Sequence, residues 1–149
     1  MFSKSTEYAL RATIFIARQS SIDKKVSIQE IAEGIGAPKP FTAKILQQLT
    51  NKEYGIISSV TGPSGGFYIT DEARAKPIFS VIDIMGERHV IEKCVLGLPK
   101  CSDEHPCSMH KSYKSIKVEL LGMFKNKTID ELSKSKDHLI PVHLIHDKI

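Results

Sequence analysis

Three cysteines, Cys94, Cys101 and Cys107, lie within 14 residues of a chain that has no other cysteine, and His110 follows three positions after the last. A thiolate is a soft, strongly binding metal ligand, and an imidazole can complete such a set. The segment also holds charged and polar residues that make a poor buried core; they are Lys93, Lys100, Ser102, Asp103, Glu104 and His105. The segment therefore predicts a metal or cluster site rather than three buried structural cysteines.

The spacing leaves the identity of the metal open. Structural zinc sites favour paired C-x₂-C knuckles, whereas here six residues separate Cys94 from Cys101 and five separate Cys101 from Cys107. Wide gaps suit a loop that wraps around a bulky iron–sulfur cluster. Zinc and a thiol redox switch remain alternatives, and His110 is either the fourth ligand or a surface histidine at a helix start.

Helical patterns dominate the first third of the chain. Apolar residues recur at helical spacing over 6–18, and Ser27 with Glu30 forms a capping box that predicts a short helix ending at Gly36. A second helix is expected over 40–52, after two prolines. Two short helices joined by a glycine-containing turn predict a helix-turn-helix.

A β-hairpin is predicted directly after this motif. Residues 56–60 are β-branched, 62–66 are a glycine-rich turn, and 67–69 are again strand-like. A hairpin in this position is the layout of a winged helix, in which the second helix enters the major groove of DNA and the wing lies along the backbone or minor groove. The expected fold is therefore mainly α with a small β wing.

The second helix of the motif supplies candidate DNA contacts. Phe41, Ile45 and Leu49 repeat every four residues and are expected to point inward. The polar residues between them are expected to face solvent, where they can meet bases or phosphates; they are Lys39, Thr42, Lys44, Gln47 and Gln48. Ser3 and Lys4 precede the first helix, where backbone amides and a cation can hold a phosphate.

The remainder of the chain is expected to position the cysteines and join two copies. A short buried helix is predicted over 78–85, and an amphipathic helix over 111–126 carries too much apolar surface for a helix at the edge of a monomer. A dimer interface is the functional interpretation, and folding back on the winged helix is the alternative. The domains expected are 1–76 (winged helix), 77–110 (linker helix and cysteine loop), 111–132 (dimerisation helix and short cap helix) and 133–149 (tail).

Composition narrows the class of protein. The net charge is +4, and residues 1–52 hold eight Lys or Arg against four acidic residues, which is compatible with a polyanionic partner. No apolar run approaches the roughly 20 residues that span a bilayer, so no membrane association is expected. An odd number of cysteines argues against a disulfide framework and favours the cytoplasm. No catalytic constellation stands out, so an enzyme is not expected.

These parts, in this order, resemble the IscR/NsrR family of winged-helix, iron–sulfur-dependent bacterial regulators. The resemblance covers about residues 1–132 and is carried by Ser3-Lys4, Tyr8–Arg11, Ile28–Ala32, Val60–Phe67 and the three cysteines before a long helix. It implies a homodimer whose long helices cross, with each cysteine loop near the DNA-binding unit of the other subunit.

The resemblance also implies roles for single residues. Cys94, Cys101 and Cys107 match the three cluster thiolates, and His110 matches the fourth ligand of IscR-like members. In NsrR-like members an acidic residue of the first helix of the other subunit ligates instead, and Glu7 lies at that place. The cluster implied is [2Fe–2S] or [4Fe–4S].

The DNA-contacting positions depart from the family pattern. Thr61, before the wing residues Gly62 and Ser64, stands where many members have arginine. Ala43 stands where IscR has a glutamate that discriminates between sites, and Pro40 replaces a serine. The resemblance therefore implies a different operator from that of IscR.

The hypothesis is a homodimeric transcription regulator that binds double-stranded DNA and senses redox state, nitric oxide or iron–sulfur status through its cluster. RNA polymerase is a possible further partner of such a regulator. One alternative keeps the winged helix but places zinc or a thiol switch at the cysteines. The other is a small electron-transfer or cluster-delivery protein, which would bind no DNA.

Overall fold

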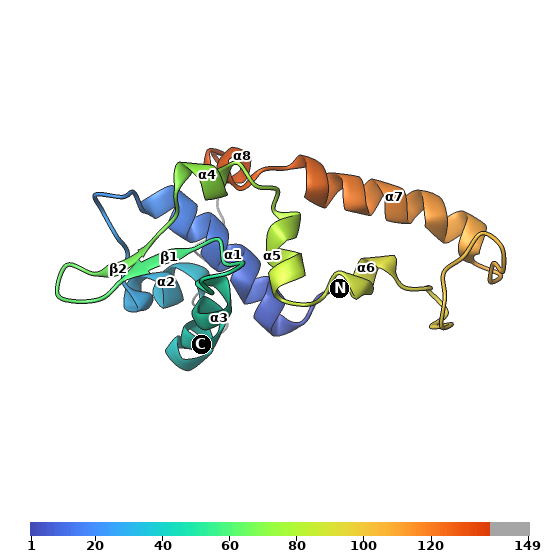
Figure 1. Cartoon of the computed structure of the whole chain (residues 1–149), viewed down its shortest axis with the longest axis horizontal. Coiled ribbons are helices and arrows are strands. Elements are labelled where there is room, and N and C mark those ends of the chain that lie inside the picture. Colours follow the sequence, from blue (N-terminus) through green and yellow to red (C-terminus); the bar gives the residue numbers. More distant parts are fainter. Residues whose placement is uncertain (138–149) are drawn as a thin grey trace.

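The computed structural model describes residues 1–137, which form eight helices and one two-stranded hairpin (Figure 1). The predicted fold, mainly α with a small β wing, is confirmed. Within the described range, no helix combines the length and apolar character needed to cross a bilayer. The predicted tail, 133–149, lies outside the described residues from position 138 onward.

The first three helices build the helix-turn-helix. The helix α1 (Lys4–Gln19) begins at Ser3, whose hydroxyl accepts a hydrogen bond from the Thr6 amide. The helix α2 (Ile28–Ile35) opens with the complete capping box of Ser27 and Glu30 and ends at Gly36, which adopts φ 67°. A left-handed residue at that point favours glycine, because glycine has no Cβ to clash. The helix α3 (Lys39–Leu49) follows after three residues.

The wing is the hairpin of β1 (Ser58–Val60) and β2 (Gly66–Tyr68), paired antiparallel with Ser59 opposite Phe67. An isolated bridge between Val26 and Phe67 ties the hairpin to the segment before α2. The wing is therefore anchored at its base, while its turn projects away from the helices (Figure 1).

The hydrophobic core lies where α1 crosses α2, α3 and α5. It consists mainly of isoleucine, leucine and alanine, including Ala9, Ile16, Ile31, Ile45 and Leu49, all less than 3% exposed. Burial of an isoleucine or leucine side chain contributes about 1.5–3 kcal/mol each. This core holds the winged helix together without the cysteine loop.

The second half of the chain forms an arm. Three short helices, α4 (Asp71–Arg74), α5 (Phe79–Ile84) and α6 (His89–Glu92), lead into the cysteine loop, and α7 (His110–Asn126) returns. The helix α8 (Ile129–Ser133) packs back on α1 and α4. Figure 1 shows α7 extending well beyond the winged helix, with the cysteine loop at its far end.

The predicted orientation of α3 was wrong for two residues. Thr42 is fully buried, and its hydroxyl donates to the Pro38 carbonyl at 3.0 Å, whereas Phe41 is 53% exposed. The buried face of α3 contains Thr42, Ile45, Leu46 and Leu49, the i, i+3, i+4, i+7 pattern of a helix. A strict four-residue repeat drifts off this face, so Thr42 is removed from the candidate DNA contacts.

Candidate functional site

The cysteine loop connects α6 to α7. Cys94 follows α6 and is buried, Cys101 and Cys107 are half-buried, and His110 is the first residue of α7. Gly97 has φ 75° and follows a turn in which its amide donates to the Cys94 carbonyl. The loop thus places the three predicted thiols and the predicted imidazole at the free end of the arm.

These four side chains form two pairs. The sulfur atoms of Cys94 and Cys107 are 3.6 Å apart. The sulfur of Cys101 lies 3.5 Å from Nδ1 of His110. All three cysteines are free thiols. Each pair joins residues that are distant in the loop, so the fold of the loop, and not local sequence, creates the pairing.

Both separations match those of two donors on one tetrahedral ion. With metal–sulfur bonds of about 2.3 Å and metal–nitrogen bonds of about 2.0–2.1 Å, two sulfurs lie about 3.7 Å apart and a sulfur and a nitrogen about 3.5 Å apart. Over residues 1–137, no three His, Cys, Asp or Glu side chains converge on one point suited to a metal ion. The separations within the two pairs, Cys94 with Cys107 and Cys101 with His110, are those of two protein donors on one metal ion.

The imidazole of His110 is held by a carboxylate, which a lysine holds in turn. Nε2 of His110 is 2.8 Å from Oδ1 of Asp103, and Nζ of Lys114 donates to both oxygens of Asp103 at 2.8 and 2.7 Å. The Lys114 hydrogen bond, followed by that of His110, lowers the pKa of Asp103 to about 2. A carboxylate at Nε2 assigns the imidazole proton to that nitrogen and leaves Nδ1 free for the side of Cys101.

A lysine and two backbone amides donate hydrogen bonds to the sulfurs themselves. Nζ of Lys117 donates to the sulfur of Cys101 at 3.0 Å. Backbone amides of Leu98 and Leu96 form hydrogen bonds that lower the pKa of the Cys94 thiol, which favours the thiolate. Thiolates are the metal-binding form of cysteine, so these contacts prepare the loop for a cation.

Asp103, Lys114 and Lys117 were missed in the sequence. His110, Lys114 and Lys117 are spaced by four and three residues, which places them on one face of a helix. This spacing was the available signal. The spacing matters because the cysteine loop folds against that face of the helix.

The alternative ligand Glu7 lies in α1, where it pairs with Lys4 at 3.7 Å and its side chain is 42% exposed. The helix α1 lies away from the far end of α7 (Figure 1). Within one chain the fourth donor near the cysteines is therefore His110. A contribution of Glu7 across a dimer stays a prediction.

Most of the predicted DNA contacts lie on accessible surfaces. On α3, Lys39, Lys44 and Gln47 are exposed, and Ala43 is half-buried. At the wing the exposed residues include Thr61, Gly62 and Ser64. Gly62 has φ 100°, a conformation in which a Cβ would be strained.

A groove joins the start of α1 to the start of α3. It has a volume of about 740 Å³, and its lining includes Lys4, Tyr8 and Arg11 from α1 and Lys39 from α3. The cations of Lys4 and Arg11 lie 6.0 and 5.5 Å from the Tyr8 ring. The structure thus brings the predicted contacts Lys4 and Lys39 to one basic groove. It adds Arg11, which the sequence did not indicate as a DNA contact.

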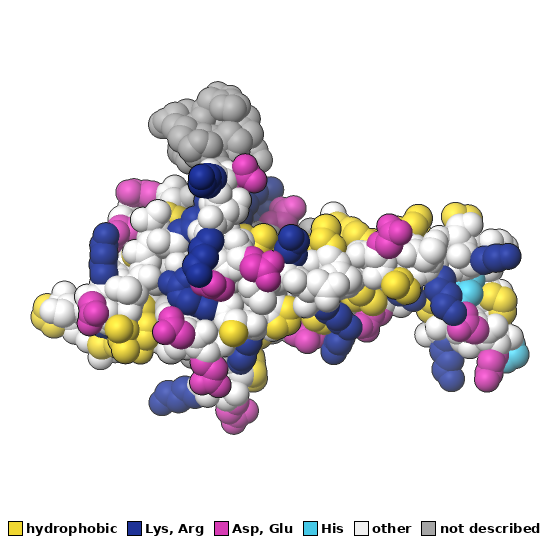
Figure 2. All heavy atoms as spheres, turned by 90° about the horizontal axis from the view of Figure 1, so that it is seen from above, with side chains coloured by type: hydrophobic (Ala, Val, Ile, Leu, Met, Phe, Trp, Pro, Cys, Tyr) yellow, Lys and Arg dark blue, Asp and Glu magenta, His cyan; other side chains and the backbone are white. Residues whose placement is uncertain are grey.

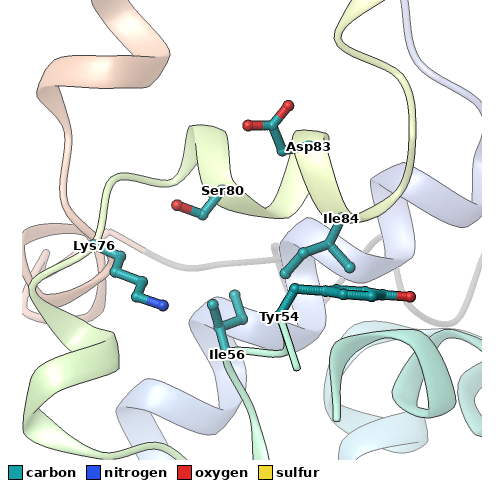
Figure 3. Close-up of a pocket in the computed structure, with 6 residues that line it drawn as sticks. All are labelled: Tyr54, Ile56, Lys76, Ser80, Asp83 and Ile84. Carbon is teal, nitrogen blue, oxygen red and sulfur yellow. The ribbon is translucent and has the colours of Figure 1, made fainter. Parts of the chain in front are cut away.

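A second hollow, of about 400 Å³, lies between α5 and the segment that follows α3 (Figure 3). Ile56 and Ile84 point toward each other across it, and Lys76 and Ser80 lie at its side. The Asp83 carboxylate points away from Ile56 in Figure 3, and it pairs with Arg88 at 3.3 Å. No convergent set of chemically active groups lies in this hollow. The candidate sites are therefore the cysteine loop and the α3–wing surface, which is formed by the exposed residues of α3 and by Thr61, Gly62 and Ser64 of the wing.

Comparisons with known proteins give the family and the fold of the chain. Residues 2–135 match the model of the Rrf2 family, described as an iron-dependent transcriptional regulator. A protein of Aquifex aeolicus, named as an HTH-type transcriptional regulator, is 34% identical over 145 residues, covering 95% of this chain and 98% of that protein. The HTH-type transcriptional regulator IscR of Yersinia pestis is 26% identical over 132 residues, covering 89% of this chain and 78% of that protein.

Solved structures share the fold. CymR, titled the global cysteine regulator of B. subtilis, superposes with a TM-score of 0.72 at 18% identity, covering 92% of this chain and 98% of that one. The T. potens IscR superposes with a TM-score of 0.67 at 18% identity, covering 92% and 88%.

Proposed function

The chain belongs to the Rrf2 family of transcriptional regulators, and from this premise we propose that it is a homodimeric DNA-binding regulator controlled by an iron–sulfur cluster in its cysteine loop. The family and the related proteins are named as transcriptional regulators, so the chain is a regulator and not an enzyme. What is proposed beyond this is the cluster, the signal and the dimer.

The observation that carries the proposal is the paired arrangement of the donors. Cys94 with Cys107, and Cys101 with Nδ1 of His110, lie at 3.6 and 3.5 Å. Two pairs are the protein ligand set of a two-iron cluster, in which each iron takes two ligands from the protein. A [2Fe–2S] cluster is therefore favoured over [4Fe–4S], which takes one ligand per iron.

The chain's own residues have distinct parts in this arrangement. When bound, the cluster would supply one-electron redox chemistry and reactivity toward small oxidants such as nitric oxide. Cys94 and Cys107 would hold one iron, and Cys101 and His110 would hold the other. Asp103 keeps the proton of His110 on Nε2, so that Nδ1 faces the sulfur of Cys101.

The loop is linked to the DNA-binding unit through α6. The hydroxyl of Tyr113 donates to the Ile91 carbonyl at 2.7 Å, which joins α7 to α6. Before α6, the Glu87 carboxylate accepts from the Ser3 amide at 3.0 and 3.2 Å, at the start of α1. A rearrangement of the loop thereby changes the support of α1. A regulatory effect needs a difference in DNA-binding free energy of about 1–3 kcal/mol between the two states.

Double-stranded DNA is the proposed partner of the α3–wing surface. The basic groove beside α3 would receive phosphates, and α3 would enter the major groove. The cytoplasm, where the bacterial chromosome lies, is the proposed compartment, and RNA polymerase is a proposed further contact at promoters. The operator and its regulon are set by α3 and the wing, whose residues differ from the IscR pattern.

The deciding experiment is purification without oxygen, followed by assays of iron, acid-labile sulfide and zinc. Two irons and two sulfides per chain are expected for the wild type, and none for Cys101→Ala. The matched control is Ser108→Ala, in the same loop, which should load fully. DNA affinity is then compared between loaded and metal-free protein, and Cys101→Ala should lose the difference. A protein that contains zinc and no acid-labile sulfide would contradict the proposed cluster and its sensing role.

A thiol switch is the second candidate, favoured by the 3.6 Å separation of Cys94 and Cys107 and by the lowered pKa of Cys94. In that case a peroxide would take two electrons and two protons from the thiols, leaving a Cys94–Cys107 disulfide and the reduced peroxide as water or alcohol. Peptide mapping of cleaved, non-reduced protein would detect the bond. A disulfide in the cell with no sulfide at any stage of purification would favour this candidate.

A further inference from the structure

Lys117 contacts one of the proposed cluster ligands directly, and its position is fixed by several contacts. Its ammonium donates to the sulfur of Cys101 at 3.0 Å and to the carbonyl of Glu92 at 2.9 Å. It also lies 5.6 Å from the centroid of the Tyr113 ring. Lys117 is half-buried, whereas Lys111 and Lys114 on the same helix are exposed. Lys117 therefore has a defined place beside one sulfur.

We propose that Lys117 is a positioning residue that sets the reduction potential of the cluster through its hydrogen bond to the sulfur of Cys101. The inference rests on the proposed function, because it presumes that Cys101 is a cluster ligand. It goes beyond that function by assigning a tuning role to a residue that is not itself a ligand.

The physical basis is the change of charge on reduction. A cluster gains one negative charge when it accepts an electron, and part of this charge resides on the ligand sulfurs. A hydrogen bond and a positive charge at 3.0 Å from a sulfur stabilise the reduced form more than the oxidised form. Hydrogen bonds to sulfur and the net charge around a cluster are main determinants of its potential. Lys117 should therefore raise the potential.

The neighbouring contacts explain why the ammonium stays in place. The Glu92 carbonyl belongs to the last residue of α6, and Tyr113 lies one turn before Lys117 in α7. A solvated lysine would spend most of its time away from any one acceptor. Here two acceptors and an aromatic face hold one nitrogen, so its charge acts at short range and in a partly dry environment.

The experiment compares midpoint potentials of anaerobically purified proteins, measured by a redox titration followed in the visible spectrum and by EPR. Lys117→Met removes the charge and the donor, and its potential is expected to be more negative than that of the wild type. Lys117→Arg keeps both and should stay near the wild type, and Lys117→Gln, which keeps a donor without charge, should lie between. Lys111→Met, which removes a charge from the same helix, is the matched control.

The outcomes separate the inference from the proposed function. If Lys117→Met loads iron and sulfide normally and its potential equals that of Lys111→Met, the inference is overturned while the cluster stands. If the Lys117 variants load no cluster while Lys111→Met does, Lys117 acts in assembly and the tuning role is overturned. If the wild type itself contains no acid-labile sulfide, the proposed function fails first, and the inference fails with it.

Discussion

His110 is held at both ring nitrogens, with Asp103 at Nε2 and Cys101 at Nδ1. A carboxylate of this kind orients a ligating imidazole and makes it a stronger donor, and its removal commonly weakens metal retention about 10–100-fold. Lys114 holds this carboxylate in place by donating hydrogen bonds of 2.7 and 2.8 Å to its oxygens. At this scale the imidazole, its carboxylate and the lysine act as one unit.

Asp103→Asn is accordingly expected to lower the retention of iron by about 10–100-fold. The amide cannot match the charge of the carboxylate at Nε2 or at Lys114. Competition with an iron chelator under anaerobic conditions, followed by the visible spectrum, measures the effect. Glu104→Gln is the matched control, because Glu104 is the neighbouring exposed carboxylate. Equal iron loss in the two variants would contradict this role of Asp103.

The corrected orientation of α3 gives a second prediction at the residue scale. Lys44 is exposed and Thr42 is buried. Lys44→Met should weaken DNA binding and reduce the slope of log affinity against log salt by about one, the loss of one phosphate contact. Thr42→Val should leave that slope unchanged and lower the free energy of unfolding by about 1 kcal/mol, the loss of one hydrogen bond. Fluorescence anisotropy at several salt concentrations and urea unfolding distinguish the two.

Single residues also show how much of the candidate sites could be predicted from the sequence. The three thiols and His110 were predicted as candidate ligands from residue type and spacing, and the loop places them in contact in two pairs. Their division into two pairs was not predictable, because it depends on a loop fold that no periodic pattern describes. Thr42 and Phe41 were assigned to the wrong faces because a short helix allows both a four-residue repeat and the true 3.6-residue period.

At the scale of elements, the start of α1 is fixed by a distant carboxylate. The Glu87 side chain, next to Gly86 with its φ of 73°, accepts the Ser3 amide. Burial acts to raise the pKa of Glu87, but the hydrogen bonds from Ser3 and Thr6 outweigh it and the pKa is lowered from 4.5. A negative charge at a helix N-terminus is also favoured by the helix dipole.

A pH dependence of stability follows. Because the pKa of Glu87 is lower in the folded chain, its ionised form stabilises the fold above about pH 4.5, and this contribution is lost as the pH falls below that value. Glu87→Gln should be less stable than the wild type at neutral pH, and the difference should shrink toward about pH 3. Urea unfolding at both pH values tests this. Glu53→Gln controls for the loss of one charge, because Glu53 is an exposed carboxylate after α3.

Regular elements were well predicted where their signals were strong. The capping box at Ser27 and Glu30 gave the start of α2, and Gly36 gave its end. The helices α4 and α6 are four residues each, and no sequence pattern predicted them. Helices of one turn have too few residues for a period to be visible, and they depend on packing against neighbours.

At the scale of the whole molecule, α7 leaves an apolar stripe uncovered. Ile116 and Met123 are 54% and 52% exposed, and Leu120 between them is half-buried. These residues are spaced as i, i+4 and i+7 and share one side of the helix. Figure 2 shows hydrophobic side chains along this arm, away from the winged helix. A second copy of the chain is the proposed cover.

Ile116→Lys should therefore convert a dimer to a monomer and weaken operator binding, since two half-sites would no longer be held together. Val118→Lys is the matched control, because Val118 is 63% exposed and lies on the opposite side of the helix. Sedimentation velocity over a range of concentrations measures both variants. A wild type that is monomeric at every concentration, or a Val118→Lys variant that dissociates equally, would contradict the assignment of this stripe.

The cysteine loop lies at the end of the arm, and its residues contribute nothing to the core formed by α1, α2, α3 and α5. Removal of the metal with a chelator should therefore leave the thermal unfolding of that core within a few degrees of the loaded protein. Circular dichroism of both forms checks this, and loss of the helical signal on chelation would contradict it. On the proposed function, such a molecule would stay folded when its cluster is lost. Each copy could then be reloaded, so the duration of a response would be set by how fast clusters are rebuilt and not by how fast new protein is made.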